Sequence, residues 1–204
     1  VAWGAAIKIN ELGGKVVTLS GPDGYVHDPK GISCDKIEYM LELRASNQDI
    51  VAPYADEYPE AIFHPNKRPW EVEVDVALPC ATQNELDGND AKQLLDNGCI
   101  CVAEGANMPS TPEAVEQFLN AGILFGPAKA ANAGGVATSG LEMTQNAEKL
   151  AWTREEVDAK LHRIMTSIHE ACVKHGTKDD GTVDYVKGAN VAGFLKVANA
   201  MLDQ

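Results

Sequence analysis

A glycine-rich stretch at residues 129–143 places the strongest constraint on what this chain can fold into. It opens on a single cation, Lys129, contains the pair Gly134-Gly135, and is otherwise made of small residues with several hydroxyl or amide side chains. The apolar run at 123–125 before it predicts a strand, and the residues after it predict a helix. Ligands of open α/β sheets bind where a strand ends and small residues lead into a helix. The stretch therefore favours a ligand site, and a tight connection that uses glycine only for backbone freedom is the alternative.

Short apolar runs alternate with helical patterns along the chain. Strands are predicted at 15–20, 61–63, 74–78, 99–103 and 123–125. Helices are predicted at 1–12, 33–44, 50–58 with Asp49 as cap, 90–97, 112–122, 154–174 and 189–202. Alternation of this kind is typical of a parallel, doubly wound sheet. We therefore predict an α/β, Rossmann-like and mostly parallel sheet at 1–134, followed by a helical part at 135–204.

Local signals fix several of the predicted helix ends. Thr111 and Pro112 form a helix start, with a capping hydroxyl and a proline at the first position. Thr153 and Glu156 have the spacing of a capping box. These signals predict where helices begin, whatever the packing around them.

Loops follow four of the predicted strands, at 20–24, 79–84, 103–109 and 129–139. Because the carboxyl ends of parallel strands meet at one edge of a sheet, such loops would line one crevice. In the first loop, Asp23 lies where an acidic side chain of such a fold can bind ribose hydroxyls. A solvated turn aspartate is the alternative for Asp23.

Charge and cysteine content exclude several classes of protein. The net charge of −13 argues against nucleic acid or an anionic membrane as a partner. The five cysteines include no C-x-x-C pair, which favours reduced thiols and a cytoplasmic location. His162 and His169 would stand about two helical turns apart with no third ligand, so no metal site is predicted. No hydrolase or P-loop signature is present.

Residues 129–143, together with 79–84, 103–109 and 188–194, resemble the coenzyme-binding domain of bacterial hexameric glutamate dehydrogenases, in the Glu/Leu/Phe/Val dehydrogenase family. The resemblance covers essentially the whole chain. It implies oxidative deamination of L-glutamate to 2-oxoglutarate and ammonia with NAD or NADP, in a cytoplasmic homo-hexamer. It also implies that the first strand of the sheet, its glycine-rich turn and the catalytic domain lie outside this sequence. We therefore expect no catalytic residue here, and no activity from these 204 residues alone.

The same resemblance assigns roles to individual residues. The adenosine ribose would be flanked by Ser20, Pro22 and Asp23. The nicotinamide half would lie near Ala81, Thr82 and Asn107, and the substrate would contact Val136 and Ser139. The negative charge of Asp23 slightly favours NAD over NADP.

Purely structural roles for these residues are the alternative interpretations. Asn107 would serve equally well as a turn-forming residue, and Ser139 as a helix cap. Two other functions also remain: a nucleotide-binding module without catalysis, and the coenzyme domain of a leucine- or phenylalanine-type dehydrogenase. Ser139 argues against the second of these, because an apolar substrate gains nothing from a hydroxyl donor.

Overall fold

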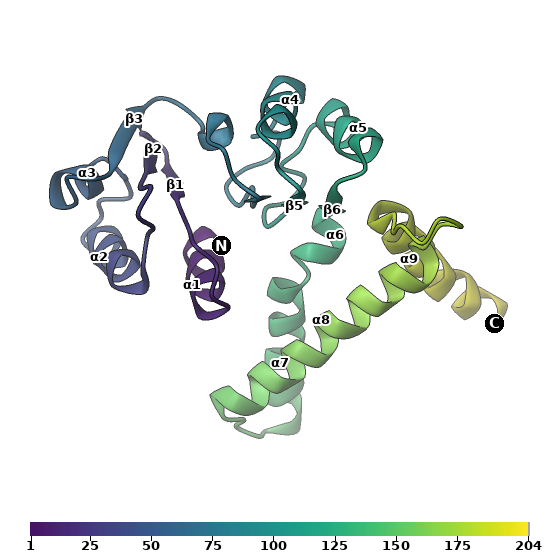
Figure 1. Ribbon diagram of the computed structural model, residues 1–204. Helices are drawn as coiled ribbons and strands as arrows, with labels where there is room; N and C mark the ends of the chain where they lie inside the picture. Colours follow the sequence, from purple (N-terminus) through teal and green to yellow (C-terminus); the bar gives the residue numbers. More distant parts are fainter. Residues whose placement is uncertain (204) are drawn as a thin grey trace. The chain divides into compact units, whose positions relative to one another are not determined.

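The computed structural model describes residues 1–203, which pack as two compact units (Figure 1). The N-terminal unit consists of Val1–Asp75 and Asn89–Cys99. The C-terminal unit consists of Val76–Gly88 and the residues from Ile100 onward. The predicted division between an α/β part at 1–134 and a helical part at 135–204 separates types of fold, not packing units. It stays a prediction. Within residues 1–203, no helix is long and apolar enough to cross a membrane.

The N-terminal unit is built on an antiparallel sheet with the strand order β1-β2-β3. Its elements are α1 (Ala2–Glu11), β1 (Thr18–Gly21), β2 (Gly24–His27), α2 (Cys34–Ala45), α3 (Pro53–Glu57), β3 (Ile62–Pro65), the 3-10 helix η1 (Pro69–Glu71) and all but the first residue of α4 (Gly88–Asp96). Because β1 is an edge strand of this sheet, one of its two sides is not paired with another strand of residues 1–203.

A tight hairpin joins β1 to β2, with Leu19 opposite Val26. The sequence predicts the turn correctly, and Gly24 adopts a φ of 144° there, a conformation that favours glycine. A Cβ atom at Gly24 would also stand 2.2 Å from the carbonyl oxygen of His64 on β3. The second strand of the hairpin was not predicted, because Tyr25 and Val26 are both buried and give no alternating pattern.

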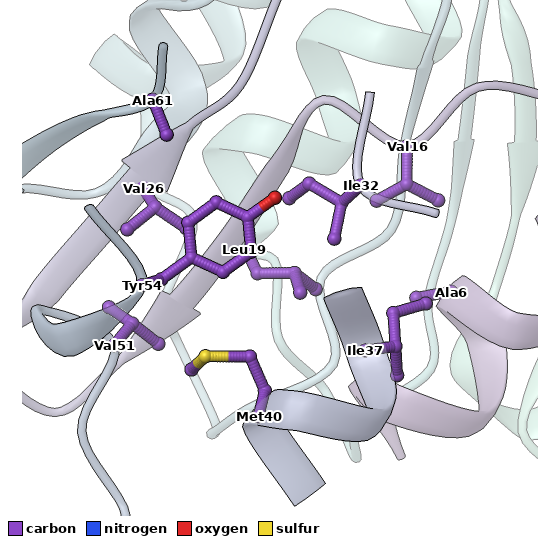
Figure 2. Close-up of a cluster of buried hydrophobic side chains, with 10 residues drawn as sticks. All are labelled: Ala6, Val16, Leu19, Val26, Ile32, Ile37, Met40, Val51, Tyr54 and Ala61. Carbon is purple, nitrogen blue, oxygen red and sulfur yellow. The ribbon is translucent and has the colours of Figure 1, made fainter. Parts of the chain in front are cut away.

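The core of the N-terminal unit forms where the sheet meets α1, α2 and α3. Figure 2 shows the Tyr54 ring among the side chains of this cluster, close to Val26. Ile37 and Met40 of α2 are both buried, and their three-residue spacing presents one helix face to the cluster. The helical periodicity seen in the sequence thus corresponds to the buried face of α2.

A buried carboxylate lies at the rim of this core. Asp28 is fully buried and accepts hydrogen bonds from Tyr54 Oη at 2.7 Å, Lys36 Nζ at 2.6 Å and the Lys30 amide at 3.0 Å. Burial raises the pKa of the Asp28 carboxyl, but the bonds from Lys36 and Tyr54 outweigh it and hold the pKa below its ordinary value. Asp28 therefore stays charged and ties the β2 end to α2 and α3.

The C-terminal unit is built on a parallel sheet with the order β4-β5-β6. Its elements are β4 (Val76–Ala77), β5 (Cys101–Ala103), α5 (Pro112–Ala121), β6 (Leu124–Gly126), α6 (Ala128–Ala131), α7 (Gly134–Glu148), α8 (Arg154–Gly176) and α9 (Tyr185–Leu202). Ala77 is paired with Val102, and Val102 with Phe125, and all three side chains are buried. The prediction of an α/β fold with a parallel sheet is confirmed.

Helix ends in this unit follow the predicted chemistry. Thr111 Oγ1 accepts from the Ala114 amide at 3.4 Å, and Thr153 and Glu156 form both bonds of a capping box. By contrast, α9 begins at Tyr185, earlier than the predicted 189, because the Asp184 carboxylate accepts from the Lys187 amide at 2.9 Å.

Helices α8 and α9 pack closely against each other. A Cβ atom at Gly188 would stand 2.1 Å from the Cys172 carbonyl oxygen, so only glycine fits at this crossing. The fit places the start of α9 directly on the last turns of α8.

Candidate functional site

The loops that leave the three parallel strands are tied together by backbone hydrogen bonds. The Gly105 and Ala106 amides, after β5, both donate to the Pro79 carbonyl after β4, at 2.9 and 3.0 Å. The Glu104 amide donates to the Gly126 carbonyl at the end of β6, at 3.0 Å. The carboxyl edge of the sheet is thus one bonded assembly, as expected for loops that follow parallel strands.

A single buried side chain strengthens this assembly. Glu104 is only 5% exposed, and its Oε1 accepts from the Ser110 amide at 3.2 Å. Its Oε2 accepts from the Ala128 amide, at the start of α6, at 2.7 Å. One carboxylate therefore joins the loop after β5 to the loop after β6. No sequence pattern predicted a role for Glu104, although an acidic residue directly after a buried strand is a signal that a partner exists.

Asn107 and Asn132 form the polar centre of the edge. The Asn132 side-chain amide donates to the Ala106 carbonyl at 3.0 Å and to Asn107 Oδ1 at 2.7 Å. Asn107 is exposed, and its own amide nitrogen has no hydrogen-bond partner within residues 1–203. The turn itself uses Met108, whose φ is 51°, rather than Asn107. Asn132 therefore orients Asn107 and leaves the two N–H donors of its side-chain amide available to a ligand.

Ala81 and Thr82 lie in the neighbouring loop, and both are exposed. The Ala81 amide donates to Glu85 Oε1 at 2.8 Å, which fixes the start of the loop. At its end, the Asn84 amide donates to the Met108 carbonyl at 3.0 Å. The structure thus joins the loop of Ala81 and Thr82 to the loop of Asn107.

The thiol beside these loops is not set up as a nucleophile. Burial, and then the charge of Glu85, raise the pKa of Cys80. A thiol is reactive as the thiolate, so a raised pKa lowers its reactivity at neutral pH. Cys80 therefore gives this edge no activated thiol.

Val136 and Ser139 lie one turn apart on the first half of α7, on the same face. Val136 is 75% exposed, and Ser139 is exposed as well. Ser139 Oγ donates to the Gly135 carbonyl at 3.4 Å and makes no cap, since the N-cap position belongs to Ala133. The reading of Ser139 as a helix cap is therefore wrong. An exposed apolar side chain beside a hydroxyl remains, which suits a ligand with methylene and polar groups.

The other three predicted residues lie in the N-terminal unit. Ser20 and Pro22 are exposed at the β1–β2 hairpin. Asp23 is half-buried, and its carboxylate accepts from the Val51 amide at 3.0 Å and the Ala52 amide at 2.9 Å. Asp23 is thus no solvated turn residue.

These bonds also correct the prediction for the following helix. α3 spans Pro53–Glu57 rather than 50–58, and its N-cap is Ala52 rather than the expected Asp49. Asp23 accepts from the Val51 and Ala52 amides just before this helix. A carboxylate has about four lone-pair sites, so Asp23 can still accept from a ligand hydroxyl.

Metal chemistry has no candidate ligands in the part of the chain that the structure describes. No group of three or more His, Cys, Asp or Glu side chains is placed to hold an ion among residues 1–203. The exposed donors and acceptors of the loop edge and of α7 are the strongest candidates for ligand contacts in the C-terminal unit.

Comparison with known proteins gives a consistent family. A sequence model described as Glutamate/Leucine/Phenylalanine/Valine dehydrogenase matches residues 1–204. An NAD-specific glutamate dehydrogenase of Bacteroides fragilis is 65% identical over 204 residues, covering 100% of this chain and 46% of that protein. An NADP-specific glutamate dehydrogenase of Haemophilus influenzae is 56% identical over 205 residues, covering 100% of this chain and 45% of that protein.

A solved structure agrees with these sequence matches. The glutamate dehydrogenase of Plasmodium falciparum superposes with a TM-score of 0.95 at 45% identity, covering 100% of this chain and 44% of that one. The chain thus spans less than half the length of the relatives it matches.

Proposed function

This chain belongs to the glutamate/leucine/phenylalanine/valine dehydrogenase family, and from that premise we propose that it is the coenzyme-binding part of an NAD(P)-dependent glutamate dehydrogenase. The proposed reaction converts L-glutamate to 2-oxoglutarate and ammonia. The observation that carries the proposal is the Asn107–Asn132 pair on the bonded loop edge, with Val136 and Ser139 exposed on the helix that follows. In such an enzyme the nicotinamide group supplies the hydride acceptor, and the protein supplies binding and alignment.

Asn107 is the residue that we assign to the nicotinamide carboxamide. Its oxygen already accepts from Asn132, which fixes the orientation of the side chain. Its amide nitrogen is then directed by that bond and can donate to a carbonyl oxygen. Ala81 and Thr82, on the adjoining loop, are exposed and line the same half of the coenzyme in this proposal.

Val136 and Ser139 are the residues that we assign to the amino-acid substrate. The Ser139 hydroxyl would donate to the side-chain carboxylate of glutamate, while Val136 packs on its methylene groups. Ser139 is free to rotate toward a ligand, because its present bond to Gly135 is long at 3.4 Å. A leucine- or phenylalanine-type substrate would leave this hydroxyl without an acceptor.

Ser20, Pro22 and Asp23 are assigned to the adenosine ribose. The half-buried carboxylate of Asp23 is held by the start of α3 and retains capacity to accept from ribose hydroxyls. Its charge would repel the additional phosphate of NADP, so we propose a preference for NAD. The relatives include both NAD-specific and NADP-specific enzymes, so this choice depends on individual residues such as Asp23.

The remaining parts of the proposal concern the longer protein. We assign no catalytic residue to this chain, so the acid–base groups would come from the other part of a full-length enzyme. We propose a cytoplasmic homo-hexamer that binds neither nucleic acid nor membrane, in keeping with the net charge of −13.

Two substitutions to valine on α7 test the function. In the full-length protein, Ser139→Val removes the proposed donor, whereas Thr138→Val removes a neighbouring hydroxyl that also bonds only to the helix backbone. A hydrogen bond to a charged group contributes about 1.5–3 kcal/mol, or about 10- to 150-fold in kcat/KM for glutamate. We expect that loss for Ser139→Val, and less than about twofold for Thr138→Val.

The same assay distinguishes the alternatives. Glutamate-dependent reduction of NAD, followed by nicotinamide absorbance, must be present in the unsubstituted protein. Coenzyme binding without turnover on any amino acid would indicate a non-catalytic nucleotide-binding module. Faster turnover of leucine or phenylalanine than of glutamate would refute the substrate assignment and leave the coenzyme assignment standing.

A further inference from the structure

The C-terminal unit contains a second feature that the proposed function does not use, a cavity of about 980 Å³. Its walls come from α6, α7, α8 and α9, and Figure 1 shows α8 crossing α7 obliquely and reaching α9. Leu141, Thr144 and Glu148 are the α7 residues that line it. At about 100° of rotation per residue, Leu141 is about 200° from Ser139 around α7, so the cavity lies on the far side of the helix from the proposed substrate residues.

Positive charge gathers around this cavity. Four cations line it, Lys129, Lys160, Arg163 and Lys196, against the single carboxylate of Glu148. None of the four forms an ion pair with a carboxylate of residues 1–203. A chain with a net charge of −13 has many carboxylates that could pair with these cations, yet the four cations that line the cavity are not paired with any of them in residues 1–203.

Two of the cations have other contacts and two have none. Lys129 Nζ donates to Asn190 Oδ1 at 2.6 Å, and Lys160 Nζ lies 4.3 Å from the centre of the Trp152 ring. Arg163 and Lys196 make no hydrogen bond or ion pair within the described part of the chain. Arg163 therefore presents a whole guanidinium group, which can bind a carboxylate through two parallel hydrogen bonds.

Much of the remaining wall is apolar, although Thr144 and Ser167 also line it. Leu141 of α7 and the pair Ile164 and Ile168 of α8 line the cavity, and the four-residue spacing of the pair places both on one face. Apolar walls with a few polar groups, in a volume of about 300–1,000 Å³, are typical of sites for small organic ligands. A ligand that matches this cavity has an apolar body to contact the apolar wall and a negative charge at one end to contact the unpaired cations.

We propose that this cavity binds a small organic anion with an apolar body. The anionic group is held by the cations of the cavity, with Arg163 as the bidentate partner, and the body lies against Leu141, Ile164 and Ile168. The site is separate from the coenzyme and substrate residues, so it stands or falls independently of the proposed function.

Titration calorimetry of the full-length protein tests the proposal with three probes. Octanoate has both the charge and the apolar body, acetate has only the charge, and octylammonium has the body with the opposite charge. We expect octanoate to bind at least about tenfold more tightly than either of the others, because acetate lacks the methylene groups that would be buried and octylammonium lacks the charge-assisted hydrogen bond. Absence of octanoate binding would overturn the proposal.

Two matched variants locate the binding. Arg163→Glu reverses a lining charge, whereas Arg154→Glu reverses an exposed charge on the same helix that does not line the cavity. We expect octanoate affinity to fall at least about tenfold for Arg163→Glu and to change less than about twofold for Arg154→Glu. Ala192→Phe, which fills the cavity from α9, should abolish binding while the helical circular dichroism stays unchanged. Equal octanoate affinity in all three variants would place the ligand elsewhere and refute the proposal.

Discussion

Replacing Glu104 with leucine removes a carboxylate that joins the loops after β5 and β6. Its two oxygens accept from the Ser110 and Ala128 amides. Ser110 is 3% exposed, so its amide would lose its partner without gaining water, at a cost of about 1–3 kcal/mol. Ala128 is half-buried, and water would compensate part of its loss, leaving a cost of about 1 kcal/mol. We therefore expect Glu104→Leu to lower the free energy of unfolding by about 2–4 kcal/mol, out of a typical total of about 5–15.

Urea unfolding followed by circular dichroism measures this loss, and Glu104→Gln refines it. Glutamine keeps one acceptor oxygen and places an amide donor against the second backbone amide, so its loss should fall between those of leucine and the unsubstituted protein. Glu116→Leu, at an exposed position of α5, is the control and should stay within about 0.5 kcal/mol. If Glu104→Leu also stays within that range, the carboxylate does not hold the loops together and the reasoning fails.

Three further predictions concern residues outside that network. Asp23→Asn keeps the shape of the side chain but removes the charge, so the ratio of kcat/KM for NAD to that for NADP in the full-length protein should fall by at least about fivefold, and an unchanged ratio would place the discriminating charge elsewhere. Because the pKa of Asp28 is lowered by folding, the stability it contributes is present above the unfolded pKa of about 3.9 and is lost as pH falls through the folded pKa. The destabilisation of Asp28→Asn in urea should therefore shrink below about pH 4, and a pH-independent difference would contradict this. Gly188→Ala should lower the thermal midpoint because its Cβ meets the Cys172 carbonyl, whereas Gly193→Ala, with open space around it, should leave the midpoint unchanged or raise it; equal midpoints for the two would contradict the close crossing.

Local chemistry explains why some of the fold could be predicted from the sequence. A cap involves residues three apart, so Thr111 and Thr153 identify helix starts without knowledge of the rest of the chain. The parallel strands of the C-terminal unit are short apolar runs between helices, and that alternation is visible in the sequence. Features whose partners lie within one helical turn, or whose periodicity is regular, were therefore predicted correctly.

Long-range partners explain what the sequence did not reveal in the N-terminal unit. β2 pairs with β1 through a tight turn but also with β3, where Tyr25 stands opposite His64 and their rings stack at 4.5 Å between centroids. A strand covered on both faces shows no alternation, so β2 could not be recognised by period. Asp23 was read as a residue facing solvent or ligand, yet its structural partners Val51 and Ala52 are 28 and 29 residues away.

The same distinction between local and long-range signals applies to the residues of the candidate site. Asn107 and Ser139 could be proposed from the sequence because they belong to stretches that resemble a known family, and their roles stay a prediction. Glu104 and Asn132 were not proposed, because their role is to hold other residues, and their partners become neighbours only after the sheet has formed. A positioning residue belongs to no motif of its own. Its signal is the free-energy cost of leaving it unpaired, as for a buried charge directly after a strand. That cost is the physical signal to search for in related chains: an acidic residue at the end of a buried strand requires hydrogen-bond donors, and in this chain they come from the loops that carry the candidate site.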